Sequence, residues 1–346
     1  MPRPELTERE RRVLEAVIQS YVETAEPAGS RMISRRFGLS PATIRNTMSD
    51  LEAKGFLYHP HTSAGRVPTD LAYRMYVDSL TRNTAAPVPE AGWLADELNV
   101  GPSSTIATIL RRAAQSLSVV SQELGVALGP RLDHAILQRL ELTRLSQERL
   151  LLVLTLRAGG VRTIFVEVRG TIADSAVTEV AHVLNERLAG LSLNEIRSTL
   201  AARVRDSLPS RDAHELLNVF VQEGDVLFDV PLVPDVDGVV LGQTSVLAEQ
   251  PEFASGDGMR RLIALTDRQE QLAEMLRKRS ESSGISITIG NEHADPRMEH
   301  LTLVTASYHA GPVSGVIGVI GPTRMPYEKV IALVRHASQL VSEVLQ

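Results

Sequence analysis

The chain of 346 residues contains no cysteine, which excludes disulfide scaffolds, thiol nucleophiles and cysteine-ligated metal sites. It has no basic excess either, because 36 Lys and Arg stand against 42 Asp and Glu, a net charge of -6. Any nucleic-acid site must therefore be local. No apolar run approaches about 18 residues, and the first residues lead into a charged stretch rather than the apolar core of a signal peptide. We expect a cytoplasmic protein.

Motifs that mark common enzyme classes are missing as well. The chain has no H-E-x-x-H, no G-x-S-x-G, no phosphate-binding P-loop and no dinucleotide-binding fingerprint. Each of these motifs gathers the groups that one class of reaction requires, so their absence argues against those reactions. We expect no catalytic residues, no metal and no cofactor.

Charge is distributed unevenly along the chain. Residues 1–82 carry 12 Lys and Arg against 10 Asp and Glu, a net charge of +2, which leaves -8 for the remainder. Residues 30–66 are more basic still, with six Lys and Arg against two Asp and Glu. A basic segment on an acidic chain is typical of a local nucleic-acid site.

The basic segment has the pattern of a winged helix-turn-helix. Thr7 and Glu10 form a capping box that begins a first helix. Ser40 can cap a third helix with Pro41 at its first position, where proline loses no helical hydrogen bond. Two short strands flank a turn-rich tip, as in the wing of such a domain. The predicted elements are helices over 8–23, 30–36 and 41–54, strands over 56–58 and 66–67, and a further helix over 69–80.

The third predicted helix has one apolar and one polar face, as a recognition helix requires. Recognition helices place N-terminal residues against base edges, where Arg forks to guanine and Asn to adenine. Arg45 and Asn46 are thus candidates for base readout, whereas Ser40 and Thr43 suit phosphate contacts. The alternative is that Arg45 and Asn46 only decorate a solvated face. The candidate DNA-binding residues of this helix are Ser40, Ala42, Thr43, Arg45, Asn46 and Ser49.

The tip of the predicted wing carries no apolar side chain, which suits contact with phosphates or the minor groove. Arg66 is expected to meet phosphate, so that its loss would weaken binding to all DNA. His59 and His61 also allow a metal site, although no carboxylate or cysteine is near them in sequence. The candidate DNA-binding residues of the wing are His61, Thr62, Ser63 and Arg66.

Strands, helices and then strands again follow the winged helix, which predicts an antiparallel α+β domain interrupted by a helical insertion. The predicted boundaries are a winged helix-turn-helix domain over 1–82, a linker over 83–102, the discontinuous α+β domain over 103–170 and 251–346, and the insertion over 171–250.

Two further groups in the second half of the chain have alternative interpretations. Gly315, Gly318 and Gly321 have the spacing of a loose phosphate loop, but close packing of a strand is the favoured explanation. A second group, around residues 292–295, offers metal ligands, but a solvated loop is favoured. Its members are Glu292, His293 and Asp295.

The winged-helix motifs resemble those of the heat-inducible transcription repressor HrcA family. The likeness spans both ends of the chain, while residues 171–250 carry little that is diagnostic. The motifs that carry it are Glu26-Pro-Ala-Gly-Ser30, Ser40-Pro-Ala-Thr-Ile-Arg-Asn46, Pro60-His-Thr-Ser-Ala-Gly-Arg66, Tyr73-Arg74 and Gly318-Val-Ile-Gly-Pro-Thr-Arg-Met325.

This resemblance implies an α+β multidomain fold: an N-terminal winged helix-turn-helix and a GAF-like antiparallel α+β domain with an inserted helical dimerising domain. It implies a homodimer that binds an inverted-repeat operator in double-stranded DNA, represses heat-shock chaperone operons and releases them under heat stress. A two-fold dimer matches a palindrome because each recognition helix meets the same half-site. The resemblance also implies dependence on the GroE chaperonin.

Two other functional classes compete with this interpretation. An enzyme with an appended winged helix is disfavoured by the missing catalytic motifs. A ligand-responsive regulator would use the GAF-like domain as a sensor, and thermal-shift screening would reveal it, because a ligand at a hundredfold excess over Kd stabilises by about 2.7 kcal/mol.

Overall fold

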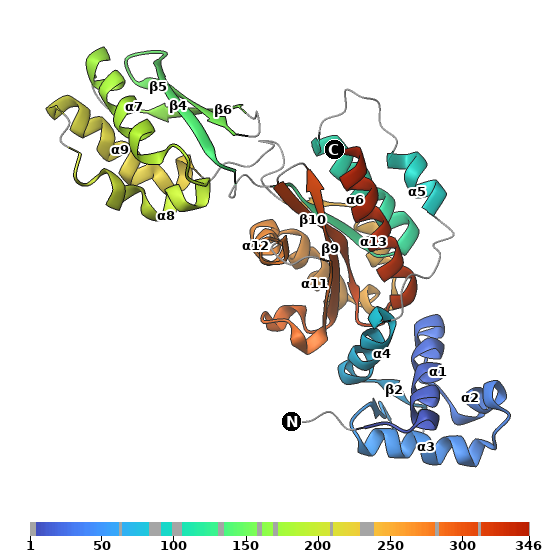
Figure 1. Cartoon of the computed structure of the whole chain (residues 1–346). Helices are drawn as coiled ribbons and strands as arrows, with labels where there is room; N and C mark the ends of the chain where they lie inside the picture. The colour runs from blue at the N-terminus through green and yellow to red at the C-terminus, as the bar shows by residue number, and fades with distance from the viewer. Residues whose placement is uncertain are drawn as a thin grey trace. The chain divides into compact units, whose positions relative to one another are not determined.

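A computed structural model of the chain (Figure 1) contains two compact units, which we describe separately. One unit joins residues 1–128, 238–308 and 316–345, and the other consists mainly of residues 129–237. The residues that the structure describes are 5–61, 64–82, 91–98, 106–130, 135–157, 161–168, 172–207, 210–228, 239–280, 284–310 and 313–345.

The first unit begins with the predicted winged helix, here called the head (residues 5–82). Its observed boundaries lie within two residues of the predicted ones, because capping side chains, Pro and Gly mark the helix ends. The elements of the head are α1 (Glu8–Thr24), α2 (Ser30–Phe37), α3 (Pro41–Ala53), β1 (Leu57–Tyr58), β2 (Val67–Pro68) and α4 (Asp70–Arg82).

The capping box at the start of α1 also ties this helix to α3. The Glu10 amide donates to the Thr7 hydroxyl at 3.3 Å, and the Thr7 amide donates to the Glu10 carboxylate at 2.8 Å. Lys54, just after α3, pairs with Glu10 at 2.7 Å. The Lys54 hydrogen bond, followed by those of Thr7, lowers the pKa of Glu10 to about 2. This anchor therefore stabilises the head above the ordinary pKa of 4.5 and is lost as the pH falls toward 2.

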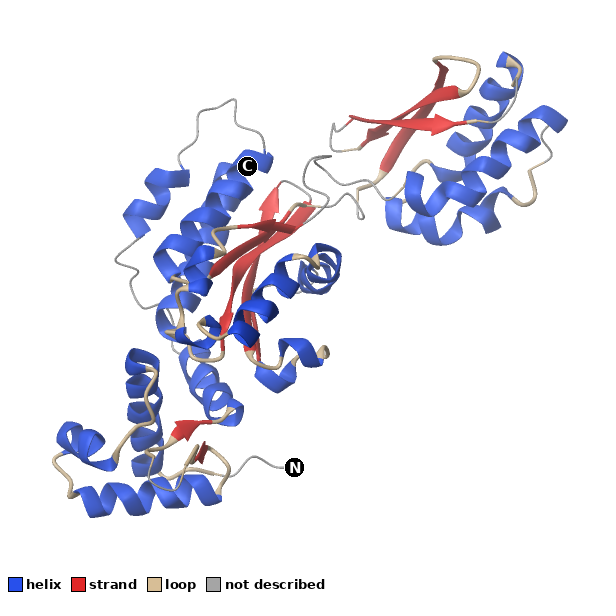
Figure 2. Cartoon of the chain, turned by 180° about the vertical axis from the view of Figure 1, so that it is seen from behind, coloured by secondary structure: helices blue, strands red, loops and turns tan. Residues whose placement is uncertain are grey.

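The rest of the first unit, here called the body, is built on a sheet with helices on both faces (Figure 2). Among the described residues the sheet has five strands in the order β7-β3-β10-β9-β8. The pairings β7 with β3, β3 with β10, and β9 with β8 are antiparallel. The elements of the body are α5 (Ala91–Leu98), α6 (Ile106–Ser121), β3 (Leu124–Leu128), β7 (Val239–Leu241), α10 (Ser245–Ala248), η2 (Pro251–Phe253), α11 (Gly256–Thr266), α12 (Gln269–Ser280), β8 (Ile285–Ile289), η3 (Gly290–Glu292), η4 (Pro296–Met298), β9 (Leu301–Ala310), β10 (Val313–Pro322) and α13 (Tyr327–Val344).

Strand β3 shows why both faces of the sheet are covered. All five of its residues are buried, as expected for a strand between two helical layers. Leu124, Val126 and Leu128 join the core cluster with side chains of α11 and α12, and α6 and α13 lie over the opposite face (Figure 1). On that side a Cβ at Gly125 would come within 1.9 Å of the Ala114 carbonyl of α6. Glycine therefore lets α6 approach the strand.

The second unit packs helices against one face of a separate antiparallel sheet of order β4-β5-β6. In β5, the alternate residues Leu150, Leu152, Leu154 and Leu156 are buried, which is the pattern of a sheet with one covered face. The elements of this unit are β4 (Leu137–Arg144), β5 (Arg149–Leu156), β6 (Val161–Glu167), α7 (Asp174–Leu188), α8 (Leu193–Val204) and α9 (Arg211–Leu227).

The second unit is an insertion in the body, but its boundaries differ from the expected 171–250. It begins after β3 and ends before β7, and these two strands are neighbours in the body sheet. The strands β4 to β6 belong to the insertion because they pack with its helices. The Asn185 side chain of α7 accepts from the Leu140 amide of β4 at 2.8 Å and donates to the Leu140 carbonyl at 2.5 Å. Residues 239–250 belong instead to the body.

The expected linker over 83–102 also needs correction, because it contains helix α5, whose Leu94 and Leu98 are buried. Helices α11 and α12 are separate, with a break at Asp267–Arg268. Among the described residues, no helix combines the length and apolar character needed to cross a membrane.

Candidate nucleic-acid interface

Helix α3 is held in the head by its apolar face. Ile44, Met48 and Leu51 are buried, as predicted, and Thr47 is buried with them. Ser40 caps the helix, because its hydroxyl accepts from the Thr43 amide at 3.1 Å. The cap therefore fixes the N-terminal turn of α3, the part of a recognition helix that contacts base edges.

The opposite face of α3 is exposed along its length. Ala42, Arg45, Asn46 and Ser49 are exposed, and Thr43 is half-buried. Within the described part of the chain, the Arg45 and Asn46 side chains form no hydrogen bond or ion pair. Their donors and acceptors are therefore free to meet base edges, and the small neighbours Ala42 and Ser49 let the helix approach a groove closely.

The wing is attached to the end of α3 by a charged cluster. Glu52 of α3 pairs with Arg66 at 2.9 Å and with the Nδ1 atom of His59 at 2.5 Å. The Arg66 side chain is only 12% exposed, whereas His61 at the tip is exposed. The sequence showed no carboxylate close to His59, but in the folded hairpin the His59 ring lies against Glu52. Arg66 thus holds the wing against the recognition helix.

The base of the wing also pairs with the segment before α2. Ala28 and Arg66 exchange two backbone hydrogen bonds, of 2.8 and 2.9 Å. A Cβ at Gly65 would lie 2.5 Å from the Pro27 and Ala28 carbonyls, so a larger residue would push these segments apart. Of the predicted wing residues, Thr62 and Ser63 lie outside the described residues. Within the described chain, no cluster of three potential ligands forms a metal site.

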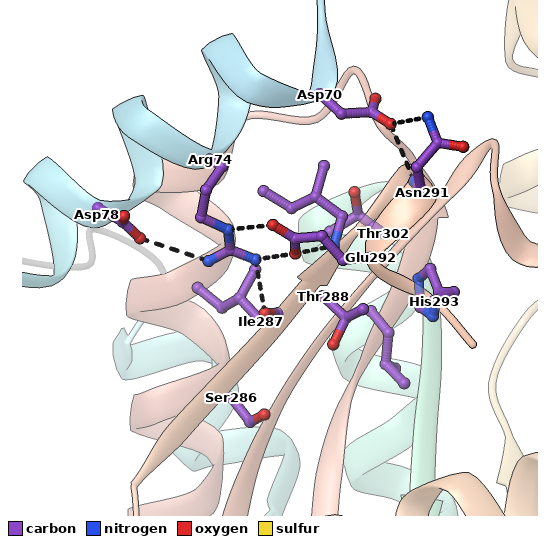
Figure 3. A network of polar contacts seen from close by, with 12 residues as sticks. Asp70, Arg74, Asp78, Ser286, Ile287, Thr288, Asn291, Glu292, His293 and Thr302 are labelled. Carbon is purple, nitrogen blue, oxygen red and sulfur yellow. Dashed lines mark hydrogen bonds and ion pairs between the residues drawn. The ribbon is translucent and has the colours of Figure 1, made fainter. Parts of the chain in front are cut away.

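The head is joined to the body by a polar network that sequence reasoning missed (Figure 3). Arg74 of α4 makes a two-bond ion pair with Glu292 of η3, in which the Nε–Oε1 distance is 2.6 Å. Arg74 also donates to the Ile287 carbonyl at 2.8 Å. Asp70 accepts from both the backbone and side-chain N–H groups of Asn291 at 2.9 Å. The first turn of α4 is therefore bonded to the turn after β8.

A second contact joins the end of α1 to the body. Arg324, which follows β10, donates to the Val22 carbonyl at 2.7 Å and pairs with Glu252 at 2.6 Å. Beside it, the rings of Tyr73 and Tyr327 lie 5.6 Å apart. The only sequence signal for these contacts was the presence of Tyr73, Arg74 and Arg324 in the recognised motifs.

The remaining candidate ligands have structural partners. Glu292 binds Arg74 rather than forming a solvated loop, His293 bonds to the Leu301 carbonyl at 3.2 Å, and Asp295 pairs with Arg297. The favoured packing explanation is confirmed for two of the three glycines. A Cβ at Gly318 would meet the Val304 carbonyl at 2.1 Å, and one at Gly321 would meet the Glu123 carboxylate at 1.9 Å.

An exposed polar recognition helix with a wing fixed beside it defines a DNA-binding protein of the winged-helix class. Comparisons with known proteins agree. A family model described as winged helix-turn-helix transcription repressor, HrcA DNA-binding, matches residues 5–81, and one described as HrcA protein C-terminal domain matches residues 107–331. The chain belongs to the HrcA family of heat-inducible transcription repressors. It is therefore a transcription repressor and not an enzyme.

Relatives of this family match over nearly the whole chain. The heat-inducible transcription repressors HrcA of Chlorobium phaeobacteroides (strain BS1) and Chlorobaculum tepidum are each 39% identical to it. Each alignment covers 99% of this chain, with 99% and 98% of the two relatives. A crystal structure of a hypothetical protein, 20% identical, matches over 99% of both chains with a TM-score of 0.58. It shares the α+β fold with an N-terminal winged helix.

Proposed function

We propose that this protein represses heat-shock chaperone operons in the cytoplasm by binding an inverted-repeat operator as a homodimer, and that it releases the operator under heat stress. The observation that carries this proposal is the exposed face of α3, where Arg45 and Asn46 have no partner among the described residues. Arg45 and Asn46 read bases in the major groove, and the amides at the helix N-terminus, with Ser40 and Thr43, bind phosphate.

The wing lies beside the same groove and contacts the backbone or minor groove. His61 at its exposed tip, with the neighbouring Thr62 and Ser63, supplies the contacts. Arg66 acts through its ion pair with Glu52, which keeps the wing at a constant distance from α3. In this proposal Arg66 positions the wing rather than releasing a counterion from DNA.

The homodimer is formed through the inserted unit. Its β4 edge is covered, because Asn185 satisfies Leu140 and the Leu137 amide donates to the Leu191 carbonyl at 2.9 Å. The other edge strand, β6, pairs with β5 on one side only, and no strand of the described part of the chain pairs with its outer edge. An unpaired edge of this kind is a place where a second chain can add.

Exposed apolar side chains on the uncovered face of this sheet also favour a dimer interface at β6. Phe165 of β6 is 64% exposed and Val161 is 51% exposed, and Leu151 of β5 lies opposite Phe165 in the register. Large exposed aromatic residues are enriched at interfaces. A two-fold contact through this face would present two heads to two half-sites of a palindrome.

Heat acts in this proposal through the GroE chaperonin, which the family resemblance suggests as a partner. Unfolded proteins that occupy the chaperonin leave less of it for the repressor, and active repressor declines. The GAF-like body then serves as the frame that joins the head to the dimerising insertion.

The test is binding of the purified protein to a duplex with the inverted repeat of the family and to a scrambled duplex, over a salt series, with and without chaperonin. A preference of about a thousandfold or more for the inverted repeat is expected. Equal binding to both duplexes, with and without chaperonin, would reject the proposed function.

A further inference from the structure

A cavity of about 510 Å³ lies within the first unit where α1 of the head meets the body. Its walls come from α11, α12, the η4 turn and the end of β10, and Tyr21 of α1 closes one side. Small-molecule sites typically measure about 300 to 1,000 Å³ and often lie at domain interfaces. The cavity has the size and position of a ligand site.

The wall formed by α11, α12 and η4 is largely apolar. Its side chains belong to, or pack against, the core cluster of the body. An apolar surface of this kind favours the hydrocarbon part of a ligand. The large aliphatic residues of the lining are Leu262, Leu265, Leu272, Met275, Met298 and Leu301.

The charged side chains of the lining leave a positive excess. Four arginines and three carboxylates line the cavity, which gives it a formal net charge of +1, and each carboxylate lies close to a basic side chain. The pairs are Arg324 with Glu252 at 2.6 Å, Arg297 with Asp295 at 2.6 Å, and His300 with Glu299 at 3.3 Å.

Two lining arginines remain, Arg261 on α11 and Arg268 at the turn between α11 and α12. Neither has an ion pair with any residue that the structure describes. Arg268 is half-buried, which strengthens its attraction to an anion. We propose that this cavity binds a small organic anion with an apolar body, whose charged group is held by Arg261 and Arg268.

A ligand in this cavity would touch the head and the body together. Tyr21 belongs to α1, and Arg324 bonds both to Glu252 and to the Val22 carbonyl of α1. Because such a ligand binds only the assembled unit, it raises the unfolding temperature as its concentration rises above Kd. This inference concerns ligand binding alone and does not depend on the proposed operator.

The probe for the test is 8-anilinonaphthalene-1-sulfonate, with N-phenyl-1-naphthylamine as a neutral analogue that keeps the apolar body. Fluorescence titration and unfolding temperature are measured for the full chain, the R261Q/R268Q variant and the R260Q control. Arg260 neighbours Arg261 but does not line the cavity. A fourth variant, A264W, fills the cavity from an exposed wall position.

We expect one saturable sulfonate site, a Kd at least about tenfold higher in R261Q/R268Q, and an unchanged Kd in R260Q. The neutral analogue should bind the parent and R261Q/R268Q equally, and A264W should lose both probes. The absence of a saturable site, a Kd within about twofold of the parent in R261Q/R268Q, or full binding to A264W would overturn the proposal.

Discussion

Arg45 is the residue through which base readout can be tested most directly. Its guanidinium is exposed on the outer face of α3 and has no partner among the described residues. We expect Arg45→Ala to weaken binding to the operator by about 1 to 3 kcal/mol and to spare binding to random DNA. The measurement is a titration of both duplexes at one salt concentration.

The matched control for this prediction is Arg187→Ala, which removes an exposed arginine from α7 of the inserted unit. It should leave both affinities unchanged. If Arg45→Ala weakened the operator and random duplexes by the same factor, Arg45 would contact phosphate rather than bases.

Glu123 carries a buried carboxyl just before β3, and the DNA-binding site does not use it. Its side chain is 2% exposed, and burial raises its pKa well above 4.5, although a hydrogen bond from Gln250 partly opposes this shift. The carboxyl occupies the space left by Gly321. The folded protein therefore holds the proton more tightly than the unfolded chain does.

This difference makes stability fall as the pH rises from about 4.5 through the folded-state pKa, by up to about 1.4 kcal/mol per pH unit. Glu123→Gln keeps an oxygen that can accept from Gln250 and removes the titration. We expect the variant to gain stability relative to the parent between pH 5 and pH 8 in urea unfolding. A constant difference over this range would show that Glu123 is ionised in the folded protein.

Single residues were predictable where a local rule determines their place. Ser40 caps α3 and Ile44 faces the core because spacing along a helix decides both positions. The ion pair of Arg66 with Glu52 was not predicted, since the hairpin brings together residues whose separation no helical rule covers. Which cation meets which carboxylate depends on tertiary structure.

The wing is an element whose attachment can be tested at Arg66. Its charge is already neutralised by Glu52, so Arg66→Ala should weaken binding to the operator and to random DNA similarly by loosening the wing. The slope of log affinity against log salt should change little, because no phosphate counterion is involved. A slope reduced by about 0.9 would instead show that Arg66 contacts phosphate in the complex.

The contact of α4 with the body is a second element-scale test. Arg74 and Glu292 form a two-bond ion pair with the Arg74 side chain only 16% exposed. A double-mutant cycle with Arg74→Ala and Glu292→Ala should give a coupling free energy of about 1 kcal/mol in urea unfolding. The exposed pair Glu274 with Lys278 on α12 is the control, with about 0.3 to 0.5 kcal/mol expected. Equal coupling in both cycles would argue against a special head-to-body contact.

Elements with strong caps or clear alternation were predictable, and buried ones were not. Strand β3 was missed because its five residues are all buried and show no alternation. The strands β4 to β6 were found but assigned to the body. Periodicity identifies a half-buried strand without telling which helices cover it.

The oligomeric state belongs to the whole molecule. We expect Phe165→Asp to place a charge on the exposed apolar face of β6 and to weaken the dimer by about 30-fold or more. Analytical ultracentrifugation measures this change. The control is Thr178→Asp, at an exposed position of α7, which should remain as dimeric as the parent. If Phe165→Asp dimerised as tightly as the parent, the interface would lie elsewhere.

At this scale the division into head, body and insertion was anticipated, whereas the joining of head and body was not. Arg74 and Glu292 are separated by 218 positions. Neither residue lies in a pattern that predicts a distant partner. Such contacts follow from the assembled fold.

The course of synthesis follows from the sheet order. Val126 of β3 pairs with Gly318 of β10 and with Leu241 of β7, so β3 has both of its neighbours only after β10 has left the ribosome. At about 5 to 20 residues per second, nearly 200 residues take about 10 to 40 s. During that interval an apolar strand with at least one open edge is exposed to other chains. If the repressor depends on a chaperonin, as we propose, this interval is the time at which its unfinished sheet would need that protection.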